Sequence, residues 1–447
     1  MNERISAVRG DVLTFVDDPF QAEMSACLRF FPDAIIVMGD GKITHVGPAA
    51  EVAALVPAGV EVARYDDAVI MAGFIDCHVH YPQTQIIGAF GEQLMDWLHK
   101  YTYVAEQAFA DPEHCRATAD VFLRECLRAG TTTSSVFCTV HPQSVDAFFE
   151  ASSALGMRNI AGKVLMDRHA PEALTDTPQR GYDESKALIA KWHEKGRQLY
   201  AVTPRFAPTS SPEQMELAGA LWQEHPGTYL QSHISESPAE VAWVRELHPE
   251  RTGYLDVYEH HGHLGPRALF GHGIHLTEQE LQRCHETGTA LAHCPTSNLF
   301  LGSGLFDLGL ASHGDRPVRV GLGTDLGAGT SFSMLATMNE AYKVAQLKGF
   351  ALSASHAFYL ATRGTAKALY LEERIGSVAV GMEADLVVLD LHSTPILDYR
   401  MGFCESLEER LFVLMTMGDD RATRATYVNG ALVYDRESSA PRDQLDH

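Results

Sequence analysis

The stretch FIDCHVH, residues 74–80, decides how this chain folds. Its apolar side chains predict a buried strand, yet His78 and His80 stand at its end. Successive side chains on a strand point to opposite faces, so the two histidines share one face. Two neighbouring imidazoles can hold a metal ion together, whereas the alternative is a pair of core histidines hydrogen-bonded to the backbone. The two interpretations differ in whether other strands supply further ligands.

Strand-like and helix-like segments alternate from this stretch to residue 325. The strand-like segments are residues 69–80, 131–137, 160–166, 199–205, 228–234, 268–273, 289–294 and 318–325. Amphipathic segments between them predict helices, among them residues 113–129, 142–155, 183–195, 212–225 and 277–287. Eight strands that alternate with helices predict a (β/α)8 TIM-like barrel of the α/β class. A doubly wound open sheet is the alternative, but no GxGxxG fingerprint follows the first strand.

The two ends of the chain carry short β-rich segments instead. Near the N-terminus, AIIVMGDGKITHVGP (34–48) contains the hairpin signal GDGK. Near the C-terminus, ATYVNGALVYD (425–435) contains an Asn-Gly turn. We therefore predict one small β-sandwich domain built from residues 1–68 and 377–447, beside a barrel of residues 69–376.

The composition of the 447 residues excludes several classes of function. A formal net charge of −23 disfavours nucleic acid and acidic membranes as partners, whereas a neutral small molecule is compatible with it. Eight cysteines without a CxxC pair predict reduced thiols. The N-terminus lacks the apolar core of a signal peptide, and no apolar run reaches the roughly 18 residues of a membrane helix. The predicted location is the cytoplasm.

Polar residues follow the predicted strands at the barrel end where chemistry takes place. They are His78, His80, His233, His272, His293 and Asp325. So many ligand-type side chains at the ends of five strands favour a metal site over satisfied core histidines. Imidazoles with a carboxylate suit zinc or iron, and a cation held there lowers the pKa of its water toward 7, giving hydroxide.

The number of metals and the proton shuttle depend on two further positions. A second metal usually needs a bridging anionic residue after the fourth strand, but that end reads TPRFAP, with Arg205 and no lysine, so we predict one metal. Glu236, three residues after His233, would stand past the fifth strand and could shuttle a proton. The alternative is a solvated carboxylate at a helix start, since SESPAEVAW opens a helix.

These residues lie in longer motifs that resemble a known family. The motifs GFIDCHVH, SHISE, GHGIHLT, HCPTSN, GLGTD and GMEADLVVLD resemble those of the amidohydrolase superfamily, over almost the whole chain. A narrower set resembles the guanine deaminases within it: HVHYPQ (78–83), GEQLMDWLHKYT (91–102) and PRFAPTS (204–210). The resemblance implies hydrolytic deamination of guanine to xanthine and ammonia in purine metabolism. It also implies one Zn²⁺ per chain, with Fe²⁺ as the alternative, and a homodimer.

The resemblance assigns roles position by position. The implied metal ligands are His78, His80, His233 and Asp325. The implied catalytic residues are Glu236, Asp325 and His272. The implied purine contacts are Gln83, Arg205, Phe206 and His233. His275, in GHGIHLT, is a histidine that the family does not require, and its position beyond the strand end favours His272 for the catalytic role.

The chemistry of guanine agrees with these assignments. Guanine carries two acceptors, O6 and N7, on one edge, and arginine binds that edge with two donors. Arg205 on that edge would turn C2 and its amino group toward the metal. Gln83 could read ring nitrogens, and Phe206 could stack on the base. A structural ion pair is the alternative for Arg205, and core packing is the alternative for Phe206.

Three other functions compete with this interpretation. The first is another deaminase or a chlorohydrolase of the superfamily, acting on an adenine nucleoside, cytosine or a triazine. The second is a barrel without activity that serves as an interaction scaffold, which would be expected to have lost ligands. The third is a separate metal-binding module at EHHGHLG (259–265), for which surface histidines are the alternative.

Overall fold

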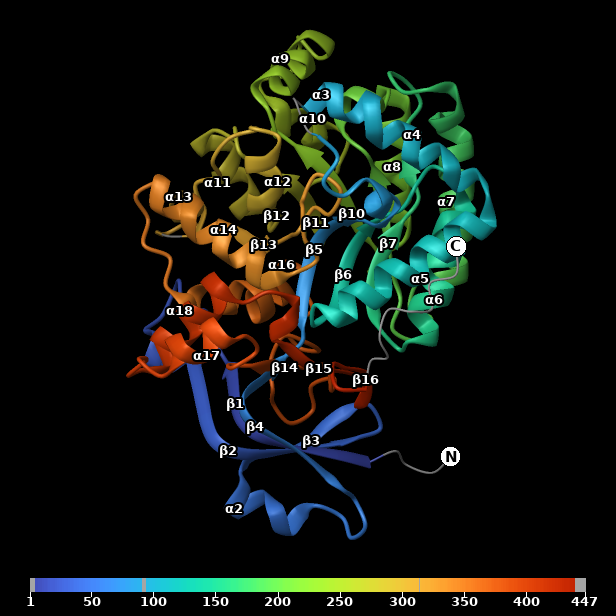
Figure 1. The fold of residues 1–447 in the computed structure, drawn as a ribbon. Coiled ribbons are helices and arrows are strands. Elements are labelled where there is room, and N and C mark those ends of the chain that lie inside the picture. Colours follow the sequence, from blue (N-terminus) through green and yellow to red (C-terminus); the bar gives the residue numbers. More distant parts are fainter. Residues whose placement is uncertain (1–4, 91–93, 313, 439–447) are drawn as a thin grey trace.

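The computed structural model describes residues 5–90, 94–312 and 314–438 of the chain. Eight parallel strands form a nearly closed barrel surrounded by helices, so the predicted (β/α)8 fold is confirmed (Figure 1). In chain order they are β5 (Phe74–His80), β6 (Thr131–Phe137), β7 (Arg158–Gly162), β9 (Leu199–Pro204), β10 (Tyr229–Ile234), β11 (Ala268–His272), β12 (Ala290–His293) and β13 (Arg319–Leu322). A short strand, β8 (Val164–Leu165), pairs with β9. First and last strands meet where the Asp325 N–H donates to the His78 carbonyl (2.8 Å).

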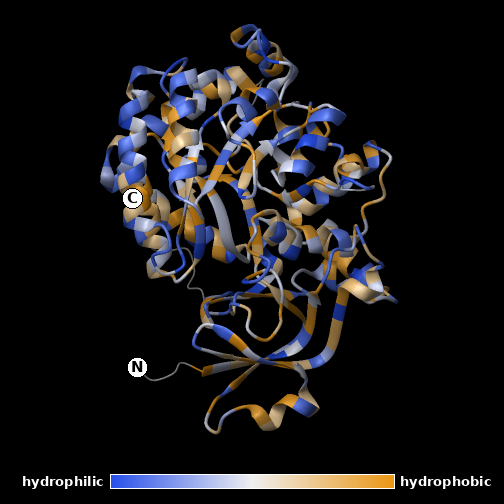
Figure 2. Cartoon of the chain, turned by 180° about the vertical axis from the view of Figure 1, so that it is seen from behind, coloured by the Kyte–Doolittle hydropathy of each residue, from blue (hydrophilic) through white to orange (hydrophobic). Residues whose placement is uncertain are grey.

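Helices cover the outside of the barrel. The main ones are α5 (Pro112–Arg128), α6 (Pro142–Ala154), α7 (Pro178–Trp192), α8 (Pro212–Glu224), α9 (Pro238–Leu247), α10 (Tyr254–His260), α11 (Glu278–Thr287), α14 (Met334–Leu347) and α18 (Leu407–Met417). In α5 the buried residues Cys115, Ala119, Phe122 and Cys126 recur every three or four positions, which places one apolar face against the barrel. Figure 2 shows hydrophilic and hydrophobic residues interspersed along these helices, as this packing requires.

Residues 69–80 form two strands, where the sequence predicts one. Val69 to Ala72 end β4 (Val62–Ala72), which belongs to the sheet of the chain termini, and the barrel begins at Phe74. Gly73 lies between the two strands. A Cβ at this position would lie 2.3 Å from Thr132 Oγ1, so the position requires a glycine. A residue without a side chain lets the chain pass closely from one sheet to the other.

Both ends of the chain build a second sheet of seven strands, below the barrel in Figure 1. Its strands, in spatial order, are β16 (Ala431–Asp435), β15 (Thr423–Val428), β14 (Leu386–Asp390), β4, β1 (Ile5–Phe15), β2 (Leu28–Gly39) and β3 (Lys42–Pro48). β14 pairs with β4, so a C-terminal strand completes an N-terminal sheet. This sheet fits the small sandwich domain predicted from the sequence, and both predicted hairpins, β2–β3 and β15–β16, are present.

Two other features bear on expectations from the sequence. None of the eight cysteines forms a disulfide, as a reduced protein requires. Within the described ranges, no helix combines the length and the apolarity needed to cross a bilayer.

An ion-pair cluster joins the barrel to the terminal sheet. Arg158, on β7, donates to Glu383 through Nε (2.7 Å). Arg197 donates to Glu383 through Nε (3.0 Å) and to Asp385 through Nη1 (3.0 Å), just before β14. Burial alone would raise the pKa of Glu383, but the hydrogen bond from Arg158 and the charges of both arginines hold it below its ordinary value. Glu383 is therefore a carboxylate whose charge the fold stabilises.

Glu383→Gln is expected to lower the free energy of unfolding by about 3 kcal/mol near neutral pH, because it leaves two largely buried guanidinium groups undercompensated. Since the folded pKa is the lower one, the contribution of Glu383 is complete above the unfolded pKa, near 4.5, and is lost as the pH falls through the folded pKa. The urea concentrations at which the wild-type protein and E383Q are half unfolded should therefore become equal in acid. Glu224→Gln, which removes the charge of an exposed carboxylate paired with Lys186 and hydrogen-bonded to Tyr182, is the control and should change little. Equal midpoints for E383Q and wild type at neutral pH would contradict the argument.

Candidate metal centre and active site

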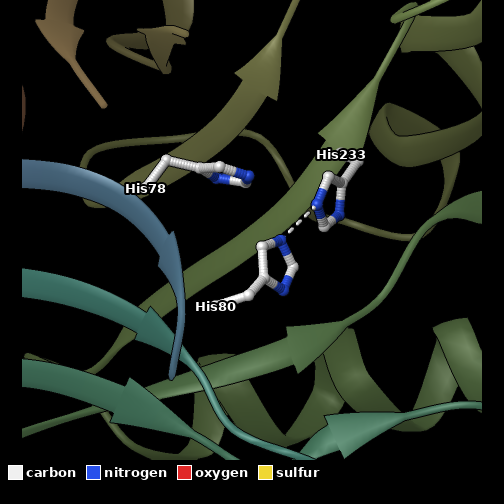
Figure 3. A group of neighbouring side chains, drawn as sticks. All are labelled: His78, His80 and His233. Carbon is white, nitrogen blue, oxygen red and sulfur yellow. Dashed lines mark hydrogen bonds between the residues drawn. The ribbon is translucent and has the colours of Figure 1, made fainter. Parts of the chain in front are cut away.

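Three histidines converge at the C-terminal end of the barrel (Figure 3). His78 and His80 extend from β5 on the same face, and His233 faces them from β10. His80 Nε2 lies 3.1 Å from His233 Nε2. The His78 and His233 ring centroids are 4.7 Å apart, with the rings nearly perpendicular. The sequence predicts that residues 78 and 80 share one face of the strand. In the structure this places the imidazoles of His78 and His80 beside that of His233.

Asp325 completes the cluster from the segment after β13. Its Oδ1 lies 3.5 Å from His78 Nε2 and 3.4 Å from His80 Nε2. Burial raises the pKa of Asp325 to about 7. Burial, reinforced by neighbouring histidines and the charge of Arg205, holds the pKa values of all three imidazoles well below their ordinary value. The histidines are therefore neutral and offer lone pairs.

These residues fit a metal ion. His78 has no hydrogen-bond partner at either ring nitrogen among the described residues, and the same holds for His80 Nδ1. Buried polar atoms are normally paired, so neutral imidazoles left without partners and aimed at a common point match the needs of a cation. His233 Nδ1 donates to the Arg205 carbonyl (2.7 Å), which turns Nε2 toward the cluster.

His272 stands beside this cluster, and two other candidate histidines do not. His272, the last residue of β11, has Nε2 3.3 Å from Glu236 Oε2 and 3.8 Å from Asp325 Oδ2. Its Nδ1 donates to Asn298 Oδ1 (2.9 Å). His275 points away, with Nε2 2.9 Å from the Ser303 carbonyl. His293 packs against Phe306 and belongs to neither of the ligand groups found in the described residues.

Glu236 faces the cavity and is not a helix cap. Ser237 and Glu240 form the capping box of α9, which leaves the Glu236 carboxyl group free of that role. Its Oε1 accepts a hydrogen bond from Ser303 Oγ (3.1 Å), and its backbone N–H donates to Glu240 Oε2 (2.8 Å). Burial raises the pKa of Glu236 to about 7. A carboxyl group that titrates near neutrality can both give and take a proton.

A small cavity of about 40 Å³ joins this cluster to a second wall. Its lining residues are His80, Gln83, Leu94, Trp97, Leu98, Arg205, Phe206, His233, Glu236, Glu240, His272, Leu301 and Asp325. The structure thus brings together the predicted purine-binding side chains and the predicted ligands. Of the motif at 91–102, residues 91–93 lie outside the described residues, whereas Leu94, Trp97 and Leu98 reach the cavity.

Some residues of the site escape sequence reasoning. Glu106, on α4 (Tyr103–Gln107), pairs with Arg205, although a single glutamate in a short helix looks solvent-exposed. Asn298 and Ser303 orient His272 and Glu236 from the segment after β12. The only available signal is that Asn298 lies within HCPTSN. At EHHGHLG (259–265), the separate metal module is not found among the described residues: His263 is buried against the Met215 carbonyl (2.8 Å).

Comparison with known proteins agrees with this geometry. The sequence model described as the amidohydrolase family matches residues 69–433. The chain belongs to the amidohydrolase family. This amidohydrolase is 50% identical to guanine deaminase of Escherichia coli (strain K12) over 435 residues, which cover 97% of this chain and 98% of the relative. The resemblance predicted from the motifs is confirmed.

Solved structures extend the comparison. The structure of E. coli guanine deaminase matches with a TM-score of 0.94 and 49% identity, covering 96% of this chain and 100% of that one. Guanine deaminase of C. acetobutylicum, with guanine bound in its active site, matches with a TM-score of 0.84 and 28% identity, covering 96% and 100%. The amidohydrolase barrel and its terminal sheet are therefore shared with both.

Proposed function

We propose that this amidohydrolase is a metal-dependent guanine deaminase that converts guanine and water to xanthine and ammonia. One observation carries the proposal: the His/Asp cluster and the Gln83–Arg205 wall share one small cavity. The cluster alone would suit many hydrolases, whereas the wall matches the polar edge of guanine. The relatives named above support the same conclusion.

In this proposal the purine lies between the wall and the cluster. Arg205 donates to O6, the base packs against Phe206, and C2 with its amino group turns toward His233 and Asp325. Arg205 and Phe206 are almost fully buried, so their contacts with a ligand are shielded from water.

The metal would be held by His78, His80, His233 and Asp325. Zn²⁺ suits three imidazoles and one carboxylate in a single site, with Fe²⁺ as the alternative. When bound, it would supply a water molecule acidic enough to lose its proton near neutral pH.

The side chains around the metal site move the protons. Asp325 accepts the proton of the attacking water, and His272, held by Asn298, faces the same point. Glu236 protonates the ring nitrogen next to C2 as the C2–O bond forms. A proton then passes to the exocyclic amine, the C2–N bond breaks, and ammonia leaves. Hydrolysis thus replaces the amino group at C2 by oxygen.

The test is xanthine and ammonia release by zinc-loaded protein, with guanine, adenine, cytosine and S-adenosylhomocysteine compared side by side. Arg205→Ala is expected to lower kcat/KM for guanine by about 10²- to 10³-fold, because the buried O6 loses its donors. Metal content should not change. Arg319→Ala is the control, since Arg319 is a partly buried arginine that packs over Tyr370 (4.1 Å to the ring centroid), outside the cavity. Turnover of another panel member but not of guanine would refute the guanine assignment and keep the metal-dependent chemistry.

We also propose a cytoplasmic homodimer. Eight cysteines without a disulfide support a reducing compartment. The homodimer rests on the family resemblance.

A further inference from the structure

A buried carboxylate, Glu106, contacts both polar residues of the purine-binding wall. Both of its oxygens accept from Arg205 Nη1 (2.9 and 2.7 Å), and Oε1 also accepts from Gln83 Nε2 (3.3 Å). Glu106 is 0% exposed, Gln83 2% and Arg205 3%. It comes from α4, outside the barrel strands, and does not itself line the cavity. Glu106 therefore acts on a ligand only through its two neighbours.

The contacts of Glu106 leave Arg205 with donors for a ligand. Nη1 is occupied by the carboxylate, whereas Nε and Nη2 donate to no other residue in the described part of the chain. Tyr103, one helical turn before Glu106, places its ring 5.7 Å from the guanidinium carbon. The helix thus fixes the plane of the guanidinium and neutralises its charge, so that a neutral base meets directed donors.

The same carboxylate fixes the orientation of the Gln83 amide. An ionised carboxylate only accepts hydrogen bonds, so the atom of Gln83 that faces Glu106 is the Nε2 donor. Gln83 Oε1 is then left as the acceptor. Gly327 lies flat against this amide, because a Cβ there would be 2.1 Å from Oε1. Gln83 is therefore held on both sides and cannot exchange its donor for its acceptor without losing the bond to Glu106.

We propose that Glu106 is a positioning residue that sets purine selectivity, by holding Arg205 as a donor and Gln83 as an acceptor toward the ligand. The inference rests on the proposed function. Guanine matches this pair with an acceptor at O6 and an adjacent donor, N1–H. A 6-aminopurine presents the reverse, an amino donor at C6 beside an acceptor at N1. Glu106 thus selects 6-oxopurines through two residues that touch the base.

The decisive comparison uses guanine and 2,6-diaminopurine, which carry the same amino group at C2 and differ in the C6–N1 pattern. Glu106→Gln gives Gln83 a donor to face, so its amide can turn and present Nε2 to the ligand. We expect kcat/KM for guanine to fall by about 10- to 100-fold. The ratio of kcat/KM for guanine to kcat/KM for 2,6-diaminopurine should fall by at least about tenfold. Glu106→Asp keeps an acceptor-only group with a shorter reach, and should narrow the ratio less. Melting temperature and metal content are recorded for each variant.

Glu383→Gln is the matched control, because it also removes a carboxylate paired with buried arginines, but far from the cavity. It should lower stability and leave the ratio unchanged. An unchanged ratio in folded E106Q, with both purines losing activity equally, would overturn the inference; should E106Q not fold, an unchanged ratio in E106D would do so. Wild-type protein without guanine turnover would instead refute the proposed function.

Discussion

His80→Ala is expected to abolish stable metal binding and to lower guanine turnover by at least about 10⁴-fold. His80 Nε2 lies at the centre of the cluster, 3.1 Å from His233 Nε2 and 3.4 Å from Asp325 Oδ1. Without it, only three of the four side chains that would hold Zn²⁺ remain, and the barrel fixes their positions, so they cannot rearrange to replace the lost ligand. Metal per chain is measured by inductively coupled plasma mass spectrometry after gel filtration, and xanthine is measured by its absorbance.

The two readouts separate the outcomes of this experiment. His285→Asn is the matched control, since His285 is partly buried and makes a hydrogen bond to the Pro317 carbonyl (2.8 Å) away from the cavity. It should retain both metal and turnover. If His80→Ala kept a full complement of metal, the ion would not be held by this cluster. If it lost metal but kept wild-type turnover, the reaction would not depend on the metal.

The fold was accessible from the sequence because its signals are local and periodic. Five of the eight barrel strands end at ligand-type residues, and helices such as α5 repeat their buried positions every three or four residues. The break at Gly73 was not accessible, since residues 69–75 are apolar without interruption and a strand pattern does not show which sheet a residue joins. The tight contact with Thr132 that requires a glycine there arises only in three dimensions.

Some residues of the candidate site could likewise be predicted from the sequence, and others could not. His78, His80, His233, His272 and Asp325 follow from their places at strand ends, because the barrel brings those ends together. Glu106 does not, since α4 follows no strand and its partner Arg205 lies 99 residues away. The sequence also offered Arg205 as either a purine ligand or a structural ion pair. The structure shows that it makes the ion pair through Nη1 and also lines the cavity.

Glu236→Gln is expected to lower kcat for guanine by about 10³-fold and to leave metal content unchanged, because the variant keeps the shape of the side chain but has no acid proton to give. Since burial raises the pKa of Glu236 to about 7, a growing share of the wild-type enzyme carries a protonated, donating Glu236 as the pH falls toward and below 7. The wild-type kcat should therefore decline as the pH rises through about 7. That decline should be absent from the residual activity of the variant.

Glu280→Gln is the control for a glutamate at a helix start, because Glu280 completes the capping box of α11 and lies outside the cavity. It should change the melting temperature slightly and kcat not at all. A residual E236Q activity that keeps the wild-type decline near pH 7 would assign that ionisation to another group of the cavity.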